Sequence, residues 1–173
     1  MAESKVYEIV LIGDGGVGKT ALVDRHMGRK YGHQYSPADG INVIPLQFNT
    51  SNGNYILNIW NIISAPGEQK FFEDADGFIV MFDVTNHYSY IGVFNIATYV
   101  KEIGKPMVIC GNKCDLADKP GVMKLKDIDI GTRFDCPFWL TSAKTNYNFE
   151  KPFMEIIRMV SGQNDITFTE ITE

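Results

Sequence analysis

Short runs of apolar, often β-branched residues recur along this chain and predict buried strands. The six runs cover residues 6–12, 43–48, 55–62, 78–84, 106–111 and 138–141. The second and third runs flank the segment 51–54, whose Asn-Gly pair is typical of a tight hairpin turn. These two strands are therefore expected to pair antiparallel.

Helical patterns fill several of the stretches between the strands. A helix is expected over residues 21–27, a second over 89–103, and a third that Gly162 would end. Both longer helices have apolar stripes, which we interpret as core-facing rather than as grooves for a partner. The stripes are Val93, Ile96, Ala97 and Val100 in one helix, and Phe153, Ile156, Ile157 and Val160 in the other.

One antiparallel hairpin within an otherwise alternating order of strands and helices predicts an α/β fold. The expected architecture has three layers: a mixed, mainly parallel six-stranded sheet with helices on both faces. A chain of 173 residues without linkers or repeats is expected to form a single domain over residues 1–173. In such folds, ligands bind beyond the carboxyl ends of the strands.

A glycine-rich segment between the first strand and the first helix fits the phosphate-binding pattern G-x-x-x-x-G-K-[ST]. Its glycines let backbone N–H groups approach phosphate oxygens, and the helix that follows adds the positive end of its dipole. Lys19 supplies a charge for the β- and γ-phosphates, and Thr20 a hydroxyl for Mg²⁺. A turn that only joins strand to helix is disfavoured by the four glycines and the correct flanks. The candidate phosphate-binding residues are Asp14, Gly15, Gly16, Val17, Gly18, Lys19, Thr20 and Ala21.

The base of the nucleotide is indicated by two loops further along the chain. Asn112-Lys113-Cys114-Asp115 follows the fifth strand, and N-K-x-D in this place resembles the guanine-binding loop of small GTPases. The carboxylate of Asp115 can accept hydrogen bonds from guanine N1–H and the exocyclic amine, which adenine does not offer. Ser142-Ala143-Lys144 follows the sixth strand and offers a backbone N–H to guanine O6. We therefore expect a guanine nucleotide, GTP or GDP, and disfavour a kinase or ATPase of the P-loop type.

Composition agrees with a globular domain, at 45% hydrophobic and 21% charged residues. A net charge of −5 argues against direct nucleic-acid binding, and no apolar run reaches the ~20 residues of a membrane span. The cysteines at 110, 114 and 136 are odd in number, and we interpret them as reduced structural thiols rather than metal ligands. A monomer that binds neither nucleic acid nor membrane is expected.

With these motifs in place, the chain resembles the small GTPases of the Ras superfamily, and specifically the Ran branch. The Ran likeness is carried by residues 13–20 with 25–26, 45–46, 60, 81–85 and 110–113, and above all by 142–153. The absence of cysteine in residues 169–173 also suits Ran rather than the prenylated branches. The resemblance implies a GTP/GDP switch with Mg²⁺ in nucleocytoplasmic transport, in nucleus and cytoplasm. Its implied partners are nuclear transport receptors and exchange or activating factors.

The segments that resemble the hydrolytic switches depart from this family. Ala38 stands where the family has a threonine that reaches Mg²⁺, and Asn61 where it has an aspartate. The water-positioning glutamine is replaced by Glu68, with Gln69 after it, and these two are the candidate catalytic residues. Between residues 71 and 82 the chain is also shorter than the Ran pattern. Hydrolysis is therefore expected to be impaired.

Two functional classes remain open on this evidence. The first is a Ran-type GTPase whose hydrolysis depends on a partner. The second is a pseudo-GTPase, a nucleotide-binding interaction module without turnover. Partner surfaces are expected to be altered, because the basic cluster of Ran ahead of the last strand is reduced here to Arg133 and the acidic tail has no counterpart.

Overall fold

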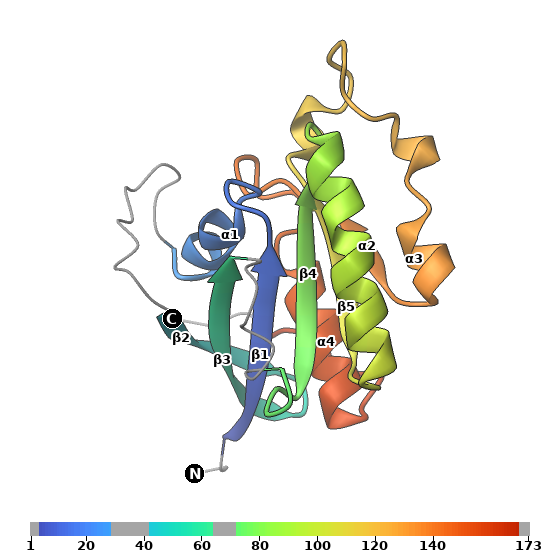
Figure 1. The fold of residues 1–173 in the computed structure, drawn as a ribbon. Coiled ribbons are helices and arrows are strands. Elements are labelled where there is room, and N and C mark those ends of the chain that lie inside the picture. Colours follow the sequence, from blue (N-terminus) through green and yellow to red (C-terminus); the bar gives the residue numbers. More distant parts are fainter. Residues whose placement is uncertain (1–3, 29–41, 64–71, 170–173) are drawn as a thin grey trace.

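The computed structural model describes residues 4–28, 42–63 and 72–169 (Figure 1). Their strands form one six-stranded sheet in the order β2-β3-β1-β4-β5-β6. The strands are β1 (Lys5–Gly13), β2 (Asn42–Thr50), β3 (Gly53–Ile63), β4 (Gly77–Asp83), β5 (Met107–Asn112) and β6 (Phe138–Leu140). The helices are α1 (Lys19–His26), α2 (His87–Glu102), α3 (Ile130–Phe134) and α4 (Lys151–Ser161).

Strand pairing confirms the expected fold class. β2 and β3 pair antiparallel through a tight turn, in which Thr50 is opposite Gly53, and every other neighbouring pair of strands is parallel. Gly53 has φ +103°, a conformation that favours glycine and accounts for the Asn-Gly signal. The sheet is therefore mixed and mainly parallel, with helices on both faces (Figure 1).

Each face of the sheet carries its own hydrophobic core, because successive residues of the buried β1 point to opposite sides. Ile9 and Leu11 pack with the residues of α1 and α4, whereas Val10 and Ile12 pack with those of α2. The two predicted stripes lie in these cores, with Ile96 and Val160 only half-buried at their margins. Fully burying one such aliphatic side chain contributes about 1.5–3 kcal/mol, which fixes the helices against the sheet.

The ends of the helices follow local chemistry. Asn86 caps α2, since its Oδ1 accepts hydrogen bonds from the backbone N–H groups of Tyr88 at 3.0 Å and Ser89 at 3.3 Å. The predicted stop of α4 is confirmed, with Gly162 at φ +69° directly after Ser161.

The segment after α4 returns to the edge of the sheet, which the sequence did not predict. Phe168 forms an antiparallel bridge with Thr50, and the N–H of Thr169 donates to the carbonyl of Asn49 at 2.9 Å. The ring of Phe168 stacks on Phe48 with centroids 5.2 Å apart. This segment covers part of the exposed edge of β2.

Residues 113–137 lack a helical stripe and form short elements. They are the 3₁₀ turns Cys114–Leu116 and Leu125–Asp127 and the five-residue helix α3. Arg133, the one base of residues 130–135, pairs with Asp129 at 2.7 Å and lies over the ring of Phe94. Its charge is thus engaged within the chain.

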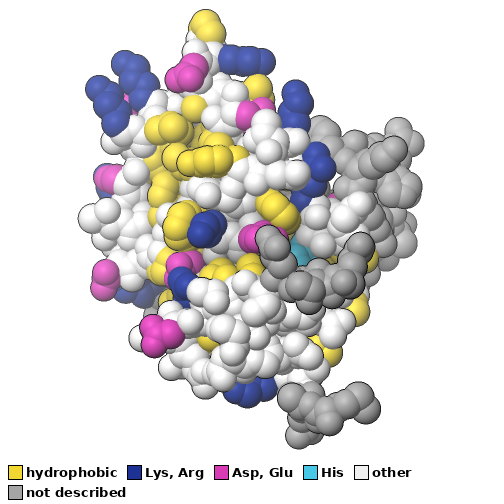
Figure 2. All heavy atoms as spheres, turned by 180° about the vertical axis from the view of Figure 1, so that it is seen from behind, with side chains coloured by type: hydrophobic (Ala, Val, Ile, Leu, Met, Phe, Trp, Pro, Cys, Tyr) yellow, Lys and Arg dark blue, Asp and Glu magenta, His cyan; other side chains and the backbone are white. Residues whose placement is uncertain are grey.

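The surface and the thiols complete the description. None of the helices in the described ranges is long and apolar enough to cross a membrane. Seen from behind, hydrophobic side chains gather in the upper half of the molecule, with charged side chains of both signs around them (Figure 2). Cys110, Cys114 and Cys136 are free, and burial raises the pKa of Cys110 to about 12 and that of Cys136 to about 11. These two thiols are therefore protonated at neutral pH.

Candidate functional site

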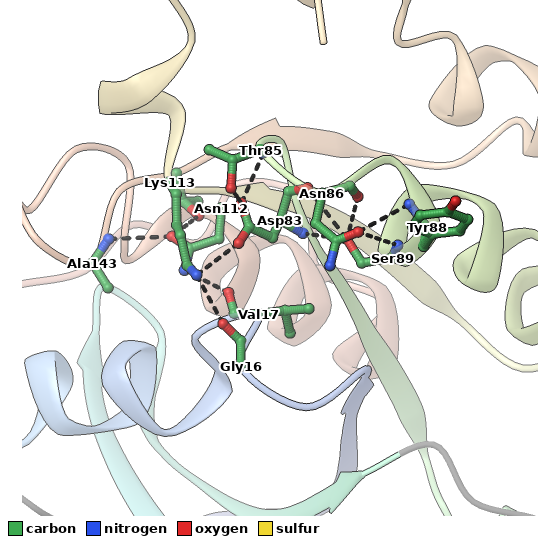
Figure 3. Close-up of polar contacts among 11 residues, drawn as sticks. Gly16, Val17, Asp83, Thr85, Asn86, Tyr88, Ser89, Asn112, Lys113 and Ala143 are labelled. Atoms are coloured by element: carbon green, nitrogen blue, oxygen red, sulfur yellow. Dashed lines mark hydrogen bonds and ion pairs between the residues drawn. The ribbon is translucent and has the colours of Figure 1, made fainter. Parts of the chain in front are cut away.

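The predicted motifs meet at the carboxyl ends of the central strands. The glycine-rich loop follows β1, and the two candidate base-binding loops follow β5 and β6. Hydrogen bonds join all three loops to one another, and the close-up in Figure 3 shows their junction.

Asn112 is the centre of this junction. Its Nδ2 donates to the carbonyl of Val17 at 2.9 Å, which fixes the glycine-rich loop. Its Oδ1 accepts hydrogen bonds from the Thr141 hydroxyl at 3.2 Å and the Ala143 N–H at 3.3 Å. One buried side chain therefore holds the three loops in register.

Gly18 must be glycine for the junction to form. It has φ +102°, and a Cβ built on it would lie 2.1 Å from Nδ2 of Asn112. Any side chain at this position would displace Asn112 and strain the backbone.

Lys19 projects back over the loop that precedes it. Its ammonium donates to the carbonyls of Gly13 at 2.7 Å and Asp14 at 2.9 Å, and the side chain is buried. Gly15 and Gly16 at the tip of the loop are exposed, and Val17 is buried beneath them. A buried cation below an exposed glycine turn at a helix N-terminus is suited to an anionic group such as phosphate.

The remaining predicted residues lie around this centre. Oδ1 of Asp115 accepts a hydrogen bond from the Ser142 hydroxyl at 2.6 Å, which orients the carboxylate. Lys144 is exposed, and Ala21 lies half-buried in the first turns of α1. Asp14 lies close to α2, where a Cβ built on Gly92 would be 3.5 Å from its carboxylate.

Arg25 contributes to the site in a way that sequence reasoning missed. From α1 its guanidinium donates to the carbonyl of Ala143 at 2.5 Å and to that of Lys144 at 3.0 Å. The arginine is adjacent to His26 in a segment noted only for its likeness to Ran. Its function depends on a contact across 118 residues of sequence, which no local pattern reveals.

Asp83 was missed as well. It ends β4 and pairs with the ammonium of Lys113 at 2.6 Å, while the same ammonium donates to the carbonyl of Gly16 at 2.8 Å (Figure 3). The sequence signals were its place at the carboxyl end of a buried strand and its membership of residues 81–85, which were noted only for their likeness to Ran.

The other side of the site contains Asn61 and Thr20. Asn61 lies opposite Leu11 in the pairing of β3 with β1, and its Nδ2 donates to the Thr20 hydroxyl oxygen at 3.1 Å. Ala38, Glu68 and Gln69 lie outside the described residues. Asn61 thus occupies the place beside Thr20 in which an aspartate was expected from the resemblance.

For Mg²⁺ these donors fit poorly. Magnesium is usually held by one or two carboxylates together with substrate phosphates, whereas this pair offers a hydroxyl and an amide. The hydroxyl oxygen already accepts a hydrogen bond from the amide. In the ranges that the structure describes, no cluster of three or more acidic, histidine or cysteine side chains is arranged to hold a metal ion.

Comparison with protein families accords with this geometry. The model of the Ras family matches residues 8–162, a span that includes the glycine-rich loop and both candidate base-binding loops.

Proposed function

Because this chain belongs to the Ras family of small GTP-binding proteins, we propose that it is a GTP/GDP switch of the Ran type with impaired GTP hydrolysis. The proposed setting is nucleocytoplasmic transport, in nucleus and cytoplasm, with transport receptors and exchange or activating factors as partners. Members of the family bind GTP or GDP and typically Mg²⁺. The finer assignment rests on particular residues.

The Ran type is supported by the segment after β6. Asn146 and Asn148 both have positive φ, at 62° and 51°, and the amide of Asn148 donates to the carbonyl of Leu140 at 3.1 Å. Asparagine tolerates this backbone conformation better than most residues. The Asn-Tyr-Asn sequence that resembles Ran therefore has a structural reason here, next to the candidate base-binding loop.

Impaired hydrolysis is supported above all by the contact between Asn61 and Thr20. An amide in place of a carboxylate removes one negative charge beside the expected position of Mg²⁺. Metal ions in P-loop NTPases neutralise charge that develops on the phosphates during transfer. A site that holds the metal weakly is expected to lose part of this stabilisation.

The same contact favours the alternative of a pseudo-GTPase, which binds nucleotide without turnover. Ala38 and Glu68 strengthen it, since neither supplies the group expected from the family at its position. The two functions differ only in whether bound GTP is ever cleaved.

A single-turnover assay with GTP labelled on the γ-phosphate separates them. We expect cleavage below about 10⁻⁴ s⁻¹ for the unmodified protein, under the intrinsic range of Ras-type proteins. Glu68→Gln is expected to raise this rate, because the resemblance implies that this position faces the γ-phosphate, where a negative charge is repelled. Ala38→Thr is expected to widen the gap between GTP and GDP affinities. Turnover at or above the family range would overturn impaired hydrolysis and make Gln69 the first candidate for positioning water.

The identity of the nucleotide is tested separately. Chromatography of the nucleotide released from freshly purified protein is expected to give GDP or GTP. In calorimetry, ATP is expected not to compete with GDP. Equal affinities for ATP and GTP would contradict the guanine assignment.

A further inference from the structure

Hydrogen bonds to Thr85 and Ser89 hold Asp83 in place. Its side chain is 8% exposed, and its Oδ1 accepts hydrogen bonds from the backbone N–H of Thr85 at 2.8 Å and the Thr85 hydroxyl at 2.7 Å. The hydroxyl of Ser89 accepts a hydrogen bond from the Asp83 N–H at 3.0 Å and contacts its carbonyl at 3.2 Å. These hydrogen bonds fix the Asp83 carboxylate without any contribution from Lys113.

The second oxygen of this carboxylate meets Lys113. The ammonium lies 2.6 Å from Oδ2 of Asp83 and 2.8 Å from the carbonyl oxygen of Gly16 (Figure 3). An ammonium has three N–H donors, so these two contacts take two of them. The side chain of Lys113 therefore spans from the loop after β5 to the glycine-rich loop.

The charge of Asp83 would oppose nucleotide binding if it stood alone. A buried carboxylate beside a phosphate-binding loop repels phosphate, and burial without a partner costs free energy. The ion pair with Lys113 neutralises this charge. It also orders the long lysine side chain within the folded protein, so that the rotamer entropy of this side chain is not lost when the nucleotide binds.

We propose that Asp83 is a positioning residue for the guanine nucleotide, and that it acts through Lys113. By holding the ammonium across the glycine-rich loop, it preorganises the aliphatic stem of Lys113 as a wall for the base. Loss of the carboxylate frees this stem and speeds nucleotide release. The inference rests on the proposed binding of guanine nucleotide to this site.

The test is the rate at which a fluorescent GDP, carrying a methylanthraniloyl group on the ribose, leaves the protein when unlabelled GDP is added. Asp83→Asn keeps the shape and the acceptor for Thr85 but removes the charge. Release is expected to be about tenfold faster, since loss of one partner from a hydrogen-bonded charge pair acts mainly on dissociation. Lys113→Ala is expected to speed release to a similar extent. In the Lys113→Ala background, Asp83→Asn should no longer speed release, because the residue through which it acts is gone, and it should slow release instead by removing an unpaired buried charge.

Glu155→Gln is the matched control, since Glu155 forms an ion pair with Arg158 at 3.2 Å on α4. This variant should release the labelled GDP at the same rate as the unmodified protein. Thermal unfolding without nucleotide shows whether Asp83→Asn weakens the fold itself. Equal acceleration by Asp83→Asn in both backgrounds, or none in either, would overturn the inference while leaving guanine binding intact. Failure of the unmodified protein to retain GDP would overturn the proposed function and this inference with it.

Discussion

The two sides of the candidate site differ in how completely their parts are joined. On the base side, Asn112, Asp115 and Ser142 make hydrogen bonds that link the loops after β5 and β6 to each other, and Asn112 also reaches the glycine-rich loop. On the metal side, the described contact is a single amide–hydroxyl hydrogen bond between Asn61 and Thr20.

This difference separates binding from chemistry. The base side depends on shape and hydrogen bonding within the folded domain, and every element that those contacts need is present. The metal side depends on negative charge and on switch segments, and its described part lacks the carboxylate. A chain can thus keep its affinity for a nucleotide while losing the ability to cleave it.

On the base side, substitution of Asp115 is expected to weaken GDP binding more than any other change proposed here. Asp115→Asn replaces an acceptor with an amide that cannot accept both guanine donors, and GDP affinity is expected to fall about 100-fold or more. Affinity for xanthosine diphosphate is expected to rise, since the extra carbonyl of xanthine suits the amide. Competition calorimetry with both nucleotides measures this exchange.

Asp118→Asn, an exposed carboxylate three residues away, is the control and should leave GDP affinity unchanged. A variant at Asp115 that keeps its preference for GDP over xanthosine diphosphate would show that this carboxylate does not contact the base.

Arg25 gives the next largest effect, because it holds the third loop from outside the motifs. A lysine cannot reproduce the fork that donates to the carbonyls of Ala143 and Lys144, so Arg25→Lys is expected to speed GDP release about fivefold. Stopped-flow fluorescence with labelled GDP measures the rate.

Arg158→Lys removes a similar guanidinium–carbonyl contact, to Ile166 after α4, and should leave release unchanged. Equal acceleration by both variants would mean that Arg25 acts through general stability rather than through the loop.

The sequence predicted the features that depend on residues close together in the chain. Buried strands, the Asn-Gly hairpin and the helix stop at Gly162 each depend on neighbouring residues, so their patterns predicted them to within a few residues. The loops of the site were found because each motif is contiguous and closes a strand. Asn61, a departure from the family pattern, lies at the end of a strand that the sequence predicted, whereas its contact with Thr20 comes only from the structure.

What the sequence did not show depends on contacts between distant segments. Asp83 meets Lys113 only because β4 and β5 are neighbours in the sheet, and Arg25 meets Ala143 only once α1 is packed. The pairing of Phe168 with Thr50 likewise required the tertiary fold. The choice between a Ran-type switch and a module without turnover depends largely on Ala38, Glu68 and Gln69, which lie outside the described residues.

On the metal side, the role of the missing carboxylate is tested by restoring it. Asn61→Asp places a negative charge next to the Thr20 hydroxyl, and Mg²⁺ is expected to stabilise bound GDP more strongly. Chelating Mg²⁺ should change the GDP release rate less than about twofold in the unmodified protein and about threefold or more in the variant. Asn52→Asp, at the exposed turn between β2 and β3, adds the same charge away from the site and should behave like the unmodified protein. Strong dependence on Mg²⁺ without any substitution would contradict the poor fit of this site for the metal.

The smallest expected effect concerns α1, the helix that carries both Thr20 and Arg25. At its end, His26 stacks on Phe48 with centroids 4.1 Å apart, and its Nε2 lies 3.0 Å from the carbonyl oxygen of Gln47. Burial lowers the pKa of His26, although the Gln47 carbonyl and Glu150 oppose this.

Since the folded state then binds fewer protons than the unfolded state, stability falls as pH drops below the unfolded pKa of about 6.5. His26→Phe keeps an aromatic ring and removes the titration, so its stability should decline less between about pH 7.5 and about pH 5.5 than that of the unmodified protein. Urea unfolding at a series of pH values measures the difference, and His87→Phe, at an exposed histidine of α2, serves as the control. The unmodified protein and His26→Phe could instead lose stability equally on acidification. In that case protonation of His26 does not affect α1, the helix that links the metal side to the base side of the site.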